Sequence, residues 1–168
     1  SIFNGNVNTL TNGVFQAYMQ VTSFSATDPQ NNYTLSGSFL PSGWGYTYST
    51  PEMLIFSTEA WDYLPTKNTT SPTTYFLGMK LVGATSIPAA IGSAPGSLLN
   101  QYSVDIYDGH LRVGTTIPTL WTWPEPVNGT FPNPVIVSTP QNQVVILKIP
   151  TLAVGQVGVL EEVGRISN

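Results

Sequence analysis

The chain has 168 residues, of which only 8% are charged, and its five basic and nine acidic residues give a formal net charge of −4. Nucleic-acid binding needs clustered Lys and Arg, so the scattered basic residues exclude that class and also disfavour an anionic membrane surface. There is no cysteine, so a core without disulfides must stabilise the fold, and no window approaches the ~20 apolar residues of a membrane-inserted helix.

Short runs of strand-forming residues follow one another along the chain, and its fourteen prolines and fifteen glycines interrupt it too often for long helices. The first run is 14–24, where Phe15, Ala17, Met19 and Val21 alternate with polar residues as in a half-buried strand. Further strands are predicted at 34–40, 53–57, 74–82, 102–107, 111–117, 120–123, 135–138, 143–149 and 156–163. The clearest hairpin is predicted at Asp108-Gly109-His110, because Asp-Gly favours the left-handed turn conformation.

The segments between these runs are expected to be loops at 27–32, 65–73 and 86–97, with a short helical turn within 94–100. Together the elements predict an all-β fold, an antiparallel β-sandwich or jelly roll of about eight to ten strands with long polar loops. We expect one domain over residues 1–168, excised from or processed out of a larger protein.

Catalytic chemistry has few candidate residues. The single histidine, His110, falls in the predicted hairpin turn, and no Gly-x-Ser-x-Gly nucleophile motif occurs. One histidine and no cysteine leave only carboxylates as zinc ligands, and although Asp105 and Asp108 could serve calcium, the density of acids in a dedicated calcium loop is absent. We therefore predict no catalytic residue, no metal and no cofactor. Glycoside hydrolysis needs only two carboxylates, so a glycosidase stays a remote alternative. Its candidate acids are Glu52, Glu59, Asp62, Asp105, Asp108 and Glu125, of which Glu59 and Asp62 flank Trp61.

Aromatic residues recur at alternate positions in two places. Trp44, Tyr46 and Tyr48 would share one face of a strand, and Trp121 and Trp123 repeat this spacing. Flat aromatic faces beside neutral hydrogen-bonding groups suit sugars or a protein partner, although aligned aromatics equally fit a core. The predicted ligand-binding residues are Trp44, Tyr46, Tyr48, Trp121 and Trp123, with Asp105 and Asp108 as polar partners.

The short strands broken by Pro and Gly, the Thr/Asn-rich tips, the scarcity of charge and the apolar run at 143–152 form a familiar profile. This profile resembles the outer projection, or spike, domain of small non-enveloped virus capsids. The resemblance implies a β-rich domain that pairs as dimers or trimers on the particle and engages receptors or glycans through its outer loops.

The function predicted from the sequence is therefore a non-enzymatic attachment domain on a virion surface that binds a host glycan or receptor. The alternative is a secreted or cell-surface carbohydrate-binding module or adhesin, which would be extracellular. A surface with little charge offers little repulsion against self-association, so a homo-oligomer, dimer or trimer, is expected in either setting.

Overall fold

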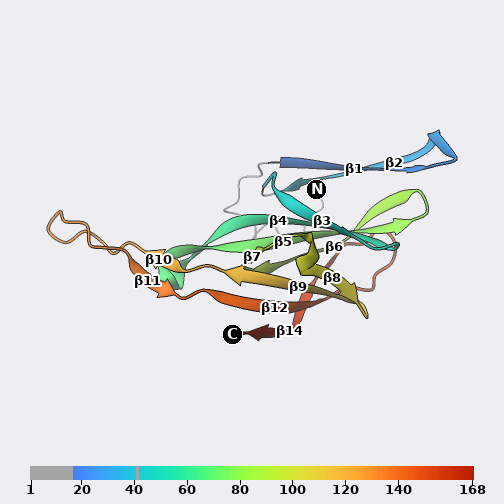
Figure 1. Cartoon of the computed structure of the whole chain (residues 1–168). Coiled ribbons are helices and arrows are strands. Elements are labelled where there is room, and N and C mark those ends of the chain that lie inside the picture. The colour runs from blue at the N-terminus through green and yellow to red at the C-terminus, as the bar shows by residue number, and fades with distance from the viewer. Residues whose placement is uncertain (1–16, 41) are drawn as a thin grey trace.

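The structure, a computed structural model, describes residues 17–40 and 42–168 and is all-β (Figure 1). The first sheet contains β3 (Gly45–Ser49), β4 (Met53–Leu64), β5 (Thr69–Val82), β6 (Thr85–Pro95) and β13 (Gly158–Val159). The second sheet contains β7 (Ser97–Leu98), β8 (Val104–Tyr107), β9 (His110–Ile117), β12 (Gln141–Lys148) and β14 (Glu161–Ser167). Two strand pairs complete the fold: β1 (Ala17–Ser25) with β2 (Asp28–Leu40), and β10 (Leu120–Thr122) with β11 (Val135–Ser138).

Both large sheets are built on an up-and-down meander. In the first, β3, β4, β5 and β6 pair antiparallel in chain order. In the second, β8, β9, β12 and β14 do the same, with the β10–β11 pair as an excursion between β9 and β12. The all-β prediction is confirmed. The finer prediction, a β-sandwich or jelly roll, is not confirmed. Meanders of chain neighbours lack the crossovers of a jelly roll, and the two facing sheets do not close into a sandwich.

The hydrophobic core lies between the facing sides of the two sheets. Strand alternation directs every second side chain of β4, β9 and β12 into this layer. The buried core residues are Ile55, Phe76, Ala90 and Ala94 from the first sheet, Leu98, Val104, Leu111, Val113, Val145 and Leu147 from the second, and Leu160. One continuous core therefore holds the two meanders together.

The β1–β2 hairpin forms a third layer against β6 (Figure 1). Its inward side is joined to the chain around the start of β6 by two hydroxyls: Thr34 donates to the carbonyl of Ala84 at 3.2 Å, and Ser36 to that of Ser86 at 2.7 Å. Side chains along β1 alternate between half-buried and exposed, as the sequence predicted. Phe15 and the rest of 14–16 lie outside the described residues.

A short strand connects the two sheets through backbone hydrogen bonds. After β12 the chain leaves the second sheet, and β13 pairs parallel to β6 of the first before β14 returns. The amide of Leu160 donates to the carbonyl of Ile91 at 2.7 Å. At Gly92 a Cβ would lie 2.5 Å from the Cβ of Leu160, so this crossing requires glycine there.

Several predicted loops are strands. The loop expected at 27–32 falls largely within β2, the loop at 86–97 is mostly β6, and the loop at 65–73 contains only a 3-10 turn (Pro65–Lys67) before β5 begins. No helical turn forms at 94–100, where β7 pairs with β9 instead; a 3-10 turn (Gln101–Ser103) follows. The run at 156–163 divides between β13 and β14.

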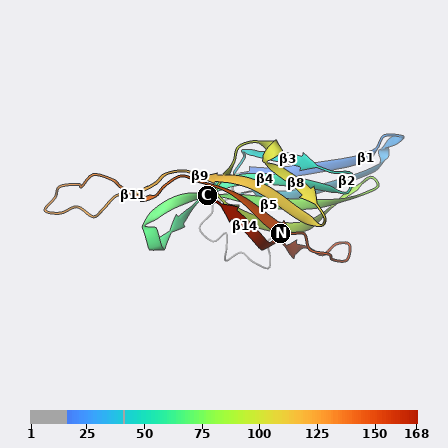
Figure 2. The same ribbon diagram turned by 60° about the horizontal axis from the view of Figure 1, so that its bottom comes forward.

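The predicted hairpin turn is confirmed at Asp108 and Gly109, whose φ angles of 48° and 71° match the left-handed conformation of a two-residue turn. Between β10 and β11 the chain projects well away from the sheets (Figure 2). No helix in the described part of the chain has the length and apolar character needed to cross a membrane.

Candidate binding groove

A groove of about 410 Å³ opens at one end of the layer between the two sheets. Along β4, Ile55 lies in the core, while Ser57, Glu59 and Trp61 continue on the same face toward this open end. Leu98 of β7 lines the groove from the second sheet. The groove is therefore the continuation of the core layer beyond the point where apolar side chains fill it.

Two tryptophans line the groove with large exposed surfaces. Trp44, just before β3, is 88% exposed, and Trp61 of β4 is 56% exposed. Tyr46 lines the same groove, and its hydroxyl donates to the carbonyl of Leu99 at 3.2 Å. Indole rings left this exposed are costly to solvate and are typical of binding surfaces.

Hydroxyl groups of β4 fix the backbone that carries Trp44. The Thr58 hydroxyl lies 3.1 Å from the carbonyls of both Ser42 and Trp44, and the Ser57 hydroxyl donates to the carbonyl of Tyr46 at 3.0 Å. Gly45 permits this approach, because a Cβ there would overlap the carbonyl oxygen of Ser57. These contacts position the segment 42–46 before any ligand arrives.

Glu59 is the one carboxylate among the described residues that line the groove, and no basic side chain accompanies it there. Asp62 lies three positions further along β4, so it projects from the opposite face of the sheet. There the Tyr75 hydroxyl donates to its carboxylate, with oxygen distances of 2.8 and 3.0 Å. Burial of Tyr75, reinforced by the bond to Asp62, raises the pKa of the tyrosine hydroxyl. The glycosidase pair considered from the sequence is thus not brought together.

Comparison with known protein families gives a match, and it is to an all-β family, as the meanders are. A family model described as a beta propeller domain matches residues 4–168. The chain belongs to the beta propeller domain family. No curated protein and no solved structure matches it.

Of the seven predicted binding residues, the propeller domain brings together only Trp44 and Tyr46. Tyr48, two positions further along β3, is half-buried and packs against the core. Trp121 and Trp123 are exposed, but they lie on and just after β10, outside the residues that line the groove. The Trp121 carbonyl accepts a hydrogen bond from Thr69, and the Thr122 hydroxyl donates to the carbonyl of Asn68 at 2.7 Å, so β10 is attached at the β4–β5 turn.

The two predicted acidic partners also lie away from the groove. Asp105 of β8 accepts a hydrogen bond from Arg112 Nε at 2.8 Å and forms an ion pair with Arg112 Nη2. The hydrogen bonds from Arg112 lower the pKa of the Asp105 carboxyl, and the guanidinium stacks 4.8 Å from the centre of the Tyr107 ring. Asp108 forms the hairpin turn. Both acids therefore have structural roles in the propeller domain.

Sequence reasoning named Trp61 only as a neighbour of two acids and missed it as a groove residue. The missed signal is the spacing of Ser57, Glu59 and Trp61, which places a hydroxyl, a carboxylate and an indole on one strand face. Their meeting with Trp44 depends on β3–β4 pairing, which a pattern along one strand does not contain. Within residues 17–40 and 42–168 no cluster of three or more His, Asp or Glu could hold a metal ion.

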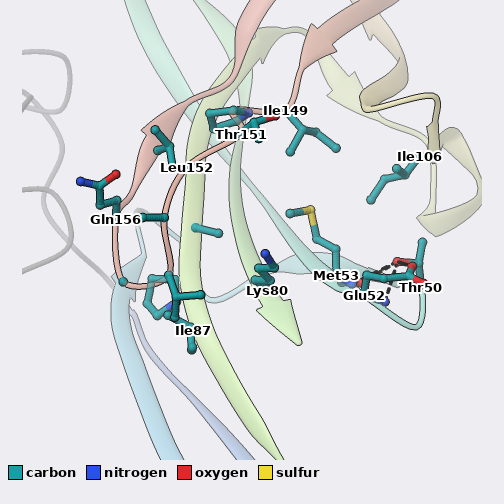
Figure 3. A pocket seen from close by; sticks show the side chains of 16 residues that line it. Thr50, Glu52, Met53, Lys80, Ile87, Ile106, Ile149, Thr151, Leu152 and Gln156 are labelled. Atoms are coloured by element: carbon teal, nitrogen blue, oxygen red, sulfur yellow. Dashed lines mark hydrogen bonds between the residues drawn. The ribbon is translucent and has the colours of Figure 1, made fainter. Parts of the chain in front are cut away.

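A second cavity, of about 280 Å³, lies at the opposite end of the same layer (Figure 3). Met53, Lys80 and Ile87 stand directly opposite one another on β4, β5 and β6 and line it from the first sheet. Ile106 and Ile149 line it from the second sheet, and the connection from β12 to β13 borders it. No aromatic side chain is among the described residues lining it, so it lacks the flat ring faces found in the groove.

Proposed function

We propose that this chain is a non-enzymatic, carbohydrate-binding part of a β-propeller and that it binds a neutral sugar in the groove between Trp44 and Trp61. The observation that carries the proposal is the pair of exposed indoles lining one groove with neutral hydroxyl groups. The apolar faces of a sugar ring stack on indole, while its hydroxyl groups need a few well-placed polar partners.

The groove supplies those partners with little rearrangement. Glu59 accepts hydrogen bonds from sugar hydroxyls, and the backbone around Trp44 is already held by Thr58 and Ser57. A preformed site limits the ordering cost of binding. The same carboxylate disfavours sialylated or sulfated sugars through charge repulsion, so neutral glycans are the expected class.

A binding role, rather than hydrolysis, is favoured by the carboxylate geometry. Both classes of glycosidase place a pair of carboxylates across the scissile bond, about 5–10 Å apart. Glu59 has no facing acid among the groove residues described, because Asp62 is on the other side of the sheet. We therefore expect Glu59→Gln to weaken sugar binding, and we expect sugar hydrolysis from neither the wild type nor the variant.

The finer architecture belongs to the same proposal. We take each four-stranded meander as one propeller blade and the β1–β2 hairpin as part of a neighbouring blade. Propeller blades are four-stranded sheets arranged around a central channel. The extracellular setting and the virion surface expected from the sequence stay predictions, since neither the fold nor the comparisons bear on them.

The test is a glycan array followed by calorimetry on the best neutral oligosaccharide. Trp44→Ala and Trp61→Ala should each weaken binding at least tenfold, the loss expected when about 1.4 kcal/mol of stacking is removed. Trp123→Ala is the matched control, because Trp123 is 65% exposed outside the groove, and it should bind like the wild type. Failure to bind any glycan, or equal losses in all three variants, would refute the proposal.

A further inference from the structure

The cavity of Figure 3, here called the Lys80 cavity, has a lysine on the wall that the first sheet provides. Lys80 stands directly opposite Met53 of β4 and Ile87 of β6, and Met53 packs against the core. Residues directly opposite one another share a face of their sheet, so Lys80 projects into the layer between the two sheets. A cation therefore stands at the edge of the apolar core layer.

Lys80 has no acidic partner in the described part of the chain. The two ion pairs found there are made by Arg112 and Arg165. Glu52 also lines the cavity, but its carboxylate accepts a hydrogen bond from the Thr50 hydroxyl at 3.4 Å and forms no ion pair with the lysine. The Lys80 side chain is exposed, so its ammonium is available to an anion that enters the cavity.

The other walls of the Lys80 cavity are apolar and held in place. Ile106 and Ile149 line it from the second sheet and pack against the core, and the amide of Ile149 donates to the carbonyl of Gly109 at 2.9 Å. On the connection from β12 to β13, Leu152 lies against Gly158, where a Cβ would lie 2.7 Å from the Cδ1 of that leucine. These walls exist before a ligand arrives, which limits the ordering cost of binding.

The volume of the Lys80 cavity restricts its ligand to a small molecule. At about 280 Å³ it is slightly smaller than the pockets of about 300–1,000 Å³ that take drug-sized ligands. At about 30 Å³ for each water-sized group, it holds roughly nine such groups. A folded partner or a lipid with two acyl chains is too large for this space.

We propose that the Lys80 cavity binds an aliphatic monocarboxylate of about the size of octanoate. The chain lies between the sheets against Met53, Ile106 and Ile149, and the carboxylate pairs with the ammonium of Lys80 at the exposed edge. A lysine suits this position, because its stem packs along apolar surface while its charged end stays in water. A second carboxylate at the inner end would be buried without a partner, so dicarboxylates are disfavoured.

The first test titrates the whole chain with straight-chain carboxylates and follows amide shifts by NMR. Octanoate should bind more than tenfold more tightly than hexanoate, because each buried methylene improves the affinity about fourfold. Dodecanoate should gain little further, since the cavity is already full. Octanedioate should bind more weakly than octanoate, because its second carboxylate meets only apolar walls.

The second test removes the charge and keeps an apolar stem. Lys80→Met should weaken octanoate binding about fivefold, the upper limit for an exposed ion pair, and leave the binding of octan-1-ol unchanged. Lys67→Met is the matched control, because Lys67 lies in the 3-10 turn outside the cavity, and it should bind octanoate like the wild type.

Three results would overturn the proposal: no binding of octanoate, equal affinities for hexanoate and octanoate, or the same octanoate affinity in the two lysine variants. The chain-length series uses the wild type, so it decides the matter even if Lys80→Met fails to fold. Trp44→Ala should bind octanoate normally, because the sugar groove lies at the other end of the layer. The two binding proposals therefore stand or fall separately.

Discussion

Gly45 offers the sharpest test of how the groove is built. In Gly45→Ala, the new Cβ would overlap the carbonyl oxygen of Ser57 and lie 3.0 Å from its carbonyl carbon and 3.3 Å from the Cα of Thr58. All three atoms are backbone of the paired strand, so no flexible side chain can move aside. The variant must either accept the strain or separate the start of β3 from β4.

The two routes have similar costs. Overpacking a well-fitted site costs about 1–3 kcal/mol. Separation instead loses the bonds from the Thr58 and Ser57 hydroxyls, at about 1 kcal/mol each. The expected loss is therefore about 2 kcal/mol, which lowers the Tm of a domain of this size by about 4–8 °C.

The assay is thermal unfolding followed by circular dichroism, with Gly43→Ala as the matched control. At Gly43 a Cβ would meet only the Cβ of Ala17, at an ordinary 3.7 Å, so this variant should unfold at or slightly above the wild-type temperature. Because the strain displaces Trp44, Gly45→Ala should also weaken sugar binding. Equal Tm values for the two alanine variants would show that the close approach of β3 to β4 is not a constraint on the fold.

Two other contacts give independent predictions. Gln143, buried in β12, donates to the Pro95 carbonyl at 2.6 Å and to the Thr115 hydroxyl at 3.0 Å. Gln143→Met should therefore lower the free energy of unfolding, measured with urea, by about 1–3 kcal/mol. An unchanged free energy of unfolding would mean that water replaces the amide. Arg112 lowers the pKa of Asp105 in the folded state. The Asp105–Arg112 ion pair therefore stabilises the fold above about pH 4, and this contribution disappears as the pH falls further. Asp105→Asn should therefore lower the Tm slightly at pH 6, and this difference from the wild type should shrink as the pH falls below about 4. A difference that grows in acid would contradict this sign.

Local chemistry predicted the strands that carry their own signals. The Asp108-Gly109 turn, the alternation along β1 and the bounds of β11 all follow from residue type and spacing. The strand β6 was missed because Pro88 and Pro95 suggest a loop. Pro88 is tolerated because it pairs with Met79 next to a bulge in the β5–β6 ladder, where a missing amide donor costs little.

The sequence predicted only some of the groove residues, because spacing along one strand does not show which other elements pack beside it. Alternation along β3 correctly places Tyr46 and Tyr48 on one face, but the position of the second sheet decides which of them is covered. Tyr48 falls over the core and Tyr46 beyond it. Trp61 joins Trp44 only through strand pairing, and Trp121 is carried away on an excursion between β9 and β12. Such placement depends on contacts between distant segments, which residue spacing does not record.

The β13 crossing has a consequence for how the molecule comes apart. Stacked meanders joined by side chains alone could open one at a time, as in repeat arrays with weak interfaces. Here the second sheet cannot be released until the backbone pairing of Gly158 and Val159 with β6, and the bond from Leu160 to Ile91, have broken. Hydrogen exchange should therefore find the slowest amides of β5 and β12 protected by one common opening free energy, making the two sheets a single cooperative unit.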